Sequence, residues 1–248
     1  ESINVVCLGK NLNGKFYEGE EYDESTPVLN QKPSQILNQA EKTKTKIVSF
    51  LGEPTLYYEY CRDISEKDDK IKKVFITSGF IEKQPIREIA KNIEAFVFYI
   101  ISMNESFYEN VAEGKLKPIL DAIKEVFEDE KWIEIKMPIF SGTNDNFYDV
   151  RKIVSWILNN LNADVPLHFV YSSKENDPFA EEVLKKARKI AVDAGMNYVY
   201  TDDVEGEGKT TLCPNCKRVI VKRINDDIEV NLKNGKCLCG QNIPGVWE

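Results

Sequence analysis

The order of secondary-structure signals is the feature that most restricts the fold of this chain. Over the first two hundred residues, short runs of β-branched and apolar residues alternate with segments in which apolar residues recur every three or four positions. A strand followed by a helix, repeated six times, predicts a parallel α/β sheet, either doubly wound or curled into a full or partial barrel. We expect strands at 3–8, 46–51, 73–77, 95–102, 132–140, 167–171 and 197–201, and helices at 85–95, 118–127, 147–161 and 180–195.

Composition limits the class of protein further. The 248 residues carry a net charge of −8, which excludes a generally basic nucleic-acid coat, and 42% of them are apolar, as in a globular chain. No apolar run reaches the roughly 18 residues that cross a bilayer, and the first residues lack the basic start and apolar core of a signal peptide. We therefore expect a soluble, cytoplasmic protein that does not contact membranes, with any ligand at the carboxyl ends of the strands.

Four of the six cysteines crowd into the last forty residues as Cys213, Cys216, Cys237 and Cys239. They flank two alternating runs, 218–224 and 228–232, that predict a β-hairpin. A cysteine cluster of this kind in a cytoplasmic chain favours a metal over disulfides, and two pairs that flank a hairpin predict a structural zinc ion in a ribbon. The second pair is C-x-C and Lys217 replaces a frequent glycine, so the alternative is a ribbon with a distorted or partly lost site.

The acidic, glycine-spaced stretch 202–208 has no periodicity and predicts a linker. We therefore expect two domains, a barrel over 1–203 and a zinc ribbon over 209–248. The ribbon has seven Lys or Arg against four Asp or Glu, a net of +3, so the rest of the chain carries −11. A basic hairpin with Arg218, Lys222 and Arg223 can contact RNA or an acidic partner, although basic edges also serve to prevent strand pairing.

His168 is the only histidine, so a histidine-rich metal site and a histidine-based catalytic triad are nearly excluded. It lies inside the predicted strand 167–171, between two apolar residues. An interior, hydrogen-bonded histidine is favoured over a catalytic base, because the sequence positions no Ser or Cys nucleophile beside it.

Five short motifs carry a resemblance to a known family. They are Leu-Gly-Glu-Pro-Thr (51–55), Val-Phe-Ile-Thr-Ser-Gly (74–79), Phe-Ser-Gly-Thr-Asn-Asp (140–145), Pro-Leu-His-Phe (166–169) and Asn-Ile-Pro-Gly-Val-Trp (242–247). With these motifs in this order, the chain resembles the radical SAM proteins of the AmmeMemoRadiSam type, which are relatives of the pyruvate formate-lyase activating enzymes. The resemblance spans nearly the whole chain and implies a partial (β/α)6 barrel followed by the zinc ribbon.

The chain departs from the family at the motif that defines its chemistry. The family has C-x3-C-x2-C after the first strand, where three thiolates hold a [4Fe–4S] cluster. The matching positions here are Lys10, Gly14 and Tyr17, none of which is a suitable iron ligand, so no iron–sulfur cluster is expected. No shift of register that starts at Cys7 recovers three sulfurs, and we expect both Cys7 and Cys61 to be small buried residues. The family's Asp-Leu-Lys signature is also replaced, by Tyr-Ile-Ile at 99–101.

Other positions match the cofactor-binding residues of the family. The resemblance implies that Glu53 accepts hydrogen bonds from the ammonium group of S-adenosylmethionine and that Ser78, Gly79, Asn144 and Asp145 line its adenosyl side. Without an iron to chelate the cofactor, a charge-assisted bond to Glu53 contributes only ~1.5–3 kcal/mol, so binding should be weak. The alternative is that backbone amides, or a lysine such as Lys10, hold the Glu53 carboxylate.

These observations favour a non-catalytic descendant of the family, a ligand-binding or protein-interaction module with an unidentified protein partner. The alternative is an S-adenosylmethionine-dependent enzyme of the glycyl-radical-activase or protein-modification type. Such an enzyme would work without iron or use a cluster supplied by a partner subunit.

Overall fold

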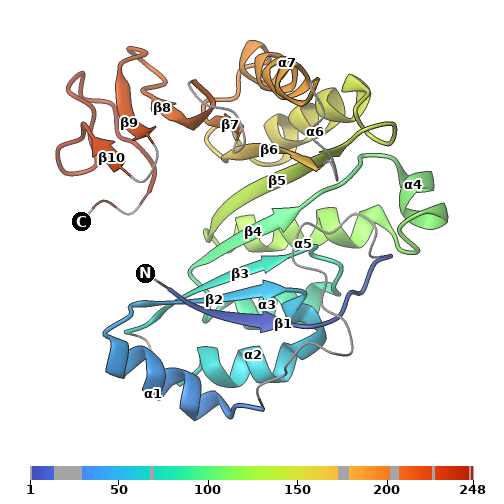
Figure 1. Ribbon diagram of the computed structural model, residues 1–248, viewed down its shortest axis with the longest axis vertical. Helices are drawn as coiled ribbons and strands as arrows, with labels where there is room; N and C mark the ends of the chain where they lie inside the picture. Colours follow the sequence, from blue (N-terminus) through green and yellow to red (C-terminus); the bar gives the residue numbers. More distant parts are fainter. Residues whose placement is uncertain are drawn as a thin grey trace. The chain divides into compact units, whose positions relative to one another are not determined.

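The computed structural model describes residues 2–13, 30–67, 70–172, 179–201, 207–224, 227–245 and 247 (Figure 1). The chain divides into two compact units, Glu1–Glu134 and Ile135–Glu248. No helix among the described residues is long and apolar enough to span a membrane.

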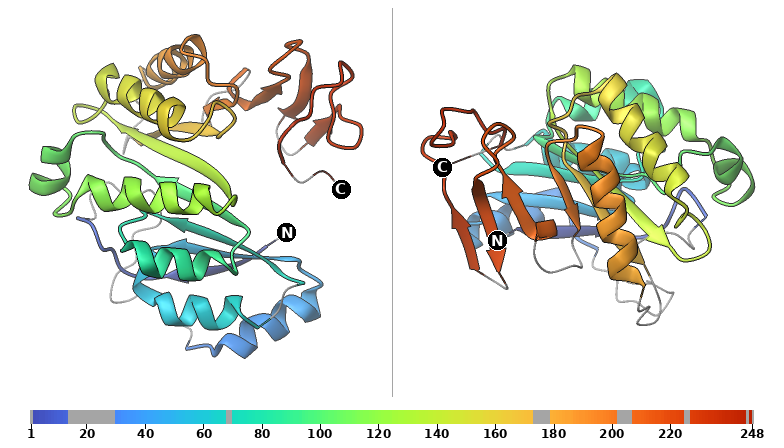
Figure 2. Two further views of the ribbon diagram at one scale, coloured as in Figure 1. Left: turned by 180° about the vertical axis from the view of Figure 1, so that it is seen from behind. Right: turned by 90° about the horizontal axis from the view of Figure 1, so that it is seen from above.

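The first unit is a parallel sheet with the strand order β1-β2-β3-β4, covered by helices. Seen from behind, α2, α3 and α5 lie over one face of these strands (Figure 2). The elements are β1 (Ile3–Cys7), α1 (Pro33–Thr43), β2 (Ile47–Gly52), the 3-10 helix η2 (Pro54–Tyr57), α2 (Tyr58–Ser65), β3 (Lys72–Thr77), α3 (Lys83–Ala90), β4 (Ala95–Tyr99), α4 (Glu105–Asn110) and α5 (Leu116–Glu128).

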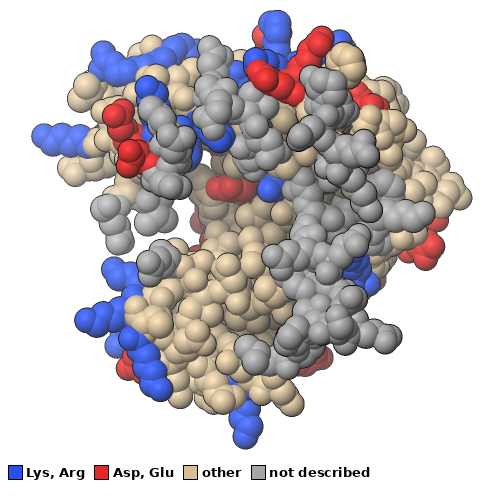
Figure 3. Space-filling view, viewed as in Figure 1, with Lys and Arg blue, Asp and Glu red and all other residues tan. Residues whose placement is uncertain are grey.

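The two faces of this sheet differ in burial. Phe50, Phe75, Phe96 and Phe98 are completely buried, and neighbouring rings lie 5.7–5.9 Å apart in the core. Apart from the buried Ser49, the residues that alternate with them point to the opposite face and are only half-buried. On this second face, the middle of the area over β1–β3 that grey atoms do not cover is tan, without Lys, Arg, Asp or Glu (Figure 3). The period-two pattern therefore produces one packed face and one open apolar face.

The second unit begins with parallel strands in the order β5-β6-β7 and continues into an antiparallel sheet with the order β10-β9-β8. Its parallel part consists of β5 (Trp132–Phe140), α6 (Phe147–Asn160), β6 (Leu167–Ser172), α7 (Ala180–Asp193) and β7 (Val199–Thr201). Its antiparallel part, the ribbon, consists of η3 (Glu207–Lys209), β8 (Thr210–Leu212), β9 (Val219–Ile224) and β10 (Asp227–Val230).

The predicted fold class is confirmed, because seven parallel strands alternate with helices in chain order and a cysteine-rich ribbon follows, as in a partial radical-SAM barrel. The strand expected at 132–140 has these bounds, whereas β4 ends at Tyr99 and not at residue 102. The helices α1 and α4 and the strand β8 were not expected. The predicted domain boundary falls on residues 202–206, which lie outside the described residues, and it stays a prediction.

Candidate cofactor and metal sites

Glu53 is held at the end of β2 by a turn that requires glycine before it. Gly52 has φ +77°, and a Cβ atom at this position would lie 2.3 Å from the carbonyl oxygen of Cys7 in β1. The backbone N–H of Glu53 donates to this same oxygen at 3.3 Å. Pro54 then begins η2, where its fixed φ suits the first helical turn. The Gly-Glu-Pro sequence thus directs the Glu53 side chain into the protein.

The Glu53 side chain is completely buried, with 0% of its surface exposed, and its carboxylate accepts five hydrogen bonds from residues that the structure describes. Its Oε1 atom accepts from Thr55 Oγ1 at 2.6 Å, Thr77 Oγ1 at 2.7 Å and Thr55 N at 3.3 Å. Its Oε2 atom accepts from Ser78 Oγ at 2.6 Å and Ser78 N at 3.1 Å. A carboxylate offers about four lone-pair sites, so donors from its own chain occupy this group fully.

Asn11, in the loop after β1, extends the network. Its Nδ2 atom donates to Thr55 Oγ1 at 2.9 Å and to the Phe80 carbonyl at 3.0 Å, and its Oδ1 atom lies 3.2 Å from Ser78 Oγ. Sequence reasoning selected Glu53 and Ser78 but missed Asn11, Thr55 and Thr77. The hydroxyl residues beside the ends of β2 and β3 were the available signal.

The alternative in which backbone amides hold Glu53 agrees with these contacts, since two of its five donors are backbone N–H groups. Gly79 has φ +74°, and a Cβ there would lie 2.9 Å from the Phe98 ring, so this position also needs glycine for packing. Lys10 is exposed in the loop after β1, whereas Gly14 and Tyr17 lie outside the described residues.

Asn144 and Asp145, in the second unit, support the loop after β5. The buried Asn144 side chain accepts from Phe140 N at 2.7 Å and donates to the Pro138 carbonyl at 2.8 Å. Asp145 Oδ2 accepts from Gly142 N at 2.8 Å. These contacts give both residues a role in loop geometry, and their predicted role in cofactor binding stays a prediction.

The two cysteines outside the ribbon are both buried, as expected. The Cys61 thiol donates to the Pro54 carbonyl at 3.7 Å. A hydrogen bond with Cys7 and burial raise the pKa of Cys61 far above its usual range. The hydrogen bond with Cys7 and burial therefore favour the neutral thiol of Cys61.

His168 is half-buried in β6 and pairs in register with Tyr200 of β7. The two rings lie 4.9 Å apart with an angle of 30° between them, and the Arg223 guanidinium lies 5.7 Å from the Tyr200 ring. Arg223 also donates to Thr211 Oγ1 at 3.3 Å. Arg223, which sequence reasoning offered as a contact for RNA, is therefore engaged in contacts inside its own unit.

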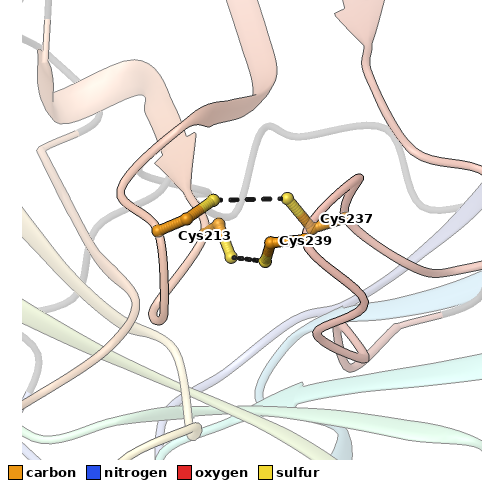
Figure 4. Close-up of side chains that lie close together, drawn as sticks. Cys213, Cys237 and Cys239 are labelled. Atoms are coloured by element: carbon orange, nitrogen blue, oxygen red, sulfur yellow. Dashed lines mark hydrogen bonds between the residues drawn. The ribbon is translucent and has the colours of Figure 1, made fainter.

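The four ribbon cysteines lie together as the sequence predicts (Figure 4). All four Sγ atoms are within 4.8 Å of one another, and the Cys213–Cys239 and Cys216–Cys237 pairs are each separated by 3.6 Å. A tetrahedral site with metal–sulfur bonds of about 2.3 Å has sulfur–sulfur edges of about 3.8 Å. The four thiols can therefore hold one metal ion without a change in backbone structure.

The protonation of the thiols is uneven. The backbone N–H of Gln241 lowers the pKa of Cys239 to about 6, with smaller contributions from the other three thiols. The pKa of Cys237 is raised to about 11, because burial and hydrogen bonds with the other thiols outweigh a hydrogen bond from the Cys239 backbone. Cys239 thus ionises readily, whereas a bound metal would have to displace the proton of Cys237.

Tight turns place each cysteine pair. Lys217, which follows the first pair, has φ +58°, and its N–H donates to the Cys213 carbonyl at 2.9 Å. Gly240, which follows the second pair, has φ +90°, and its N–H donates to the Cys237 carbonyl at 2.8 Å. Lysine thus adopts the left-handed conformation that usually selects glycine. The small ribbon core consists of Cys213, Ile220, Cys237 and Ile243, with Leu232 and Trp247 packed against it.

Comparison with solved structures agrees with the fold expected from the sequence. The chain is similar to SuiB of Streptococcus suis bound to the precursor peptide SuiA, with a TM-score of 0.59 and 16% identity over 82% of this chain and 49% of SuiB. It is also similar to a domain of the pyruvate-formate lyase-activating enzyme from Bacteroides vulgatus, with a TM-score of 0.53 and 22% identity over 62% of this chain and 97% of that domain. The chain spans about half the length of SuiB. The fold is that of the radical SAM superfamily.

No family model matches the chain. It is 32% identical over 237 residues to the uncharacterized protein MJ0808 of Methanocaldococcus jannaschii, a match that covers 88% of this chain and 68% of MJ0808. The chain therefore belongs to the same family as MJ0808.

Proposed function

We propose that this radical-SAM-fold protein is a non-catalytic ligand-binding or protein-interaction module with one structural zinc ion in its ribbon. The observation that carries the proposal is the presence of Lys10, Gly14 and Tyr17 at the positions where the resemblance puts three cluster-binding cysteines. An ammonium group has no lone pair, glycine has no side-chain ligand, and a phenol is a poor ligand for iron that prefers sulfur.

Other cysteines do not replace the missing ligands. Within the 248 residues, only Cys7 and Cys61 lie outside the ribbon, and three thiolates are needed to leave one iron of a [4Fe–4S] cluster open. Cys61 is buried and its pKa is raised, first by its hydrogen bond with Cys7 and then by burial. The residues outside the ribbon therefore do not fit a [4Fe–4S] cluster with one open iron.

The hydrogen bonds that the Glu53 carboxylate already accepts support the same proposal. An incoming ammonium group would have to displace at least one of the five donors that already bind this carboxylate. A hydrogen bond to a charged group contributes about 1.5–3 kcal/mol, so the exchange would bring little net gain. Glu53 therefore serves to join β2, β3 and the loop after β1.

The open face of the first unit supports a role in binding. Val6 and Leu51 are paired neighbours in β1 and β2, and Ile76 and Val97 are paired neighbours in β3 and β4. Val6 is 39% exposed, and the other three are half-buried. A sheet face with this much apolar surface is suited to an apolar ligand or to a protein partner.

The geometry of the four cysteines supports zinc as the ribbon metal. Four sulfurs at near-tetrahedral spacing satisfy a zinc ion completely, and such closed sites are structural because no position remains for water or substrate. The ribbon core has only a few apolar side chains, so a metal would supply much of its folding free energy.

Metal analysis of protein purified without oxygen tests the proposal. We expect one zinc ion per chain, and no iron–sulfur absorbance after incubation with ferrous iron and sulfide. The matched variant carries Lys10→Cys, Gly14→Cys and Tyr17→Cys, and it should acquire the absorbance that the unchanged protein lacks. A stoichiometric iron–sulfur cluster in the unchanged protein would overturn the proposal.

Titration calorimetry with S-adenosylmethionine separates this function from the enzymatic alternative. The module is expected to give no heat of binding at micromolar ligand. Saturable binding that is lost in Glu53→Gln, in a variant that is still folded, would favour the cofactor-dependent enzyme.

A further inference from the structure

The helices α6 and α7 of the second unit carry a basic surface on an acidic chain. The two helices lie side by side (Figure 1). Together they contain six Lys or Arg against four Asp or Glu, whereas the whole chain has a net charge of −8. Positive charge is therefore concentrated on elements other than the ribbon hairpin, where the sequence suggested a contact with RNA.

Three cations meet at the start of α6, where contacts with two adjacent residues bring them together. The ammonium group of Lys186, in α7, lies 4.4 Å from the centre of the Phe147 ring, and the Arg151 guanidinium donates to the Phe147 carbonyl at 3.1 Å. The Lys152 ammonium lies 4.5 Å from the centre of the next ring, Tyr148. Three positive charges therefore surround a pair of neighbouring aromatic side chains.

None of these three cations forms an ion pair with a residue that the structure describes. Lys186 follows Glu182 by four positions, a spacing that favours an ion pair, yet its ammonium group lies on the Phe147 ring. The neighbouring Lys185 does pair with Glu181 at the same spacing. The carboxylate in the first turn of α6, Asp149, is buried. The three charges thus remain accessible to an anionic partner.

Two large aromatic side chains are exposed where these helices begin. Tyr148, in the first turn of α6, is 57% exposed, and Phe179, directly before α7, is 66% exposed. The helices follow the parallel neighbours β5 and β6, so both begin beyond the carboxyl ends of these strands, at one edge of the sheet. Exposed rings beside unpaired cations offer stacking and charge to the same ligand.

We propose that this surface binds a single strand of nucleic acid, with a base on the Tyr148 ring and phosphates at Arg151, Lys152 and Lys186. This inference goes beyond the proposed function and concerns the second unit alone. Proteins that bind single strands without sequence preference combine aromatic platforms with a basic track, because every base has a stacking face and every phosphate a negative charge. An acidic peptide would use the cations without the ring, and a duplex has no unstacked base, so the exposed ring favours a single strand.

Fluorescence anisotropy of labelled oligouridine and oligothymidine strands of about 12 nucleotides, titrated with the full zinc-loaded chain, tests the proposal. We expect saturable binding with a dissociation constant of about 1–100 µM. Three phosphate contacts predict that the logarithm of the binding constant falls with the logarithm of the salt concentration with a slope of about −2. Binding of either strand supports the proposal, and the ratio of the two affinities shows whether RNA or DNA is preferred.

Two pairs of variants separate stacking and local charge from general attraction. Tyr148→Ala should weaken binding roughly 5- to 100-fold, whereas Tyr148→Phe keeps the ring and should bind normally. Lys186→Gln should reduce the steepness of the salt dependence by about 0.7. Lys185→Gln is its matched control, because this lysine is exposed on the same helix but is paired with Glu181. All these side chains are exposed, so the melting temperatures should stay close to that of the unchanged protein.

Three results would overturn the proposal. The first is the absence of saturable binding of either strand at about 100 µM protein in low salt. The second is equal weakening by Lys185→Gln and Lys186→Gln, which would mean that only overall charge matters. The third is equal binding of polyglutamate or of a DNA duplex of the same length, since neither offers an unstacked base to Tyr148.

Discussion

Replacing Glu53 with glutamine should destabilise the first unit by about 2–4 kcal/mol, and the hydrogen-bond geometry shows why. Glutamine keeps one acceptor oxygen, which can serve Thr55 and Thr77 as Oε1 does. Its NH2 group would face the Ser78 N–H, which now donates to Oε2 at 3.1 Å. The Ser78 hydroxyl can turn to Asn11 Oδ1 at 3.2 Å, but the N–H has no such second acceptor. One buried donor is left unsatisfied at ~1–3 kcal/mol, and the other bonds lose charge assistance.

Urea unfolding followed by circular dichroism measures this loss, with Glu109→Gln as the matched control. Glu109 is exposed in α4, so the same exchange there should change the free energy of unfolding by less than about 0.5 kcal/mol. The reasoning fails if Glu53→Gln is as harmless as Glu109→Gln. A harmless Glu53→Gln would mean that the carboxylate is kept for a ligand and does not join β2 to β3.

Three further predictions concern other parts of the chain. Cys213→Ser should abolish stoichiometric metal binding and increase amide exchange in the ribbon while β1–β4 keep their protection. Trp247→Ala should cost the ribbon about 2–3 kcal/mol, measured by amide exchange, because the indole packs on the ribbon core and donates to a backbone carbonyl. A hydrogen bond from Arg87 lowers the pKa of Glu125 in the folded protein. The ionised carboxylate therefore stabilises the fold above the unfolded-state pKa of Glu125. This stabilisation is lost as the pH falls through the lower, folded-state pKa. Glu125→Gln should therefore be less stable than the unchanged protein at pH 7 in urea titrations, and should lose less stability on acidification.

The strands could be predicted because their side chains alternate, and the one misplaced end shows the limit of that signal. The apolar run after Tyr99 is buried like a strand, yet Ile101 leaves the sheet and its N–H bonds to the hydroxyl of Tyr108 in α4. An apolar run without alternation does not distinguish a central strand from a buried loop. The end of β4 therefore depends on a tertiary contact that local sequence does not encode.

The sequence predicted all four residues of the metal centre, but only part of the hydrogen-bond network around Glu53. Both cysteine pairs are local, so spacing alone brought four sulfurs together. The Glu53 network joins residues that are up to 69 positions apart, such as Asn11 and Phe80, and no local pattern predicts which hydroxyls meet. The resemblance to the family indicated Glu53 and Ser78, whereas the parts of Thr55, Thr77 and Asn11 in the network follow only from the folded structure.

Each residue of the Gly-Glu-Pro motif (52–54) has a structural role that involves no cofactor. Gly52 is needed because any side chain would collide with the Cys7 carbonyl. Glu53 joins the end of β2 and η2 to the end of β3 through donors of its own chain, and the Pro54 carbonyl accepts from the buried Cys61 thiol. Each residue of the motif therefore contributes to the fold of the first unit by contacts that are complete without S-adenosylmethionine. A chain that lost the cluster would still lose stability if this motif changed, so the motif alone does not indicate that the chemistry of the superfamily remains.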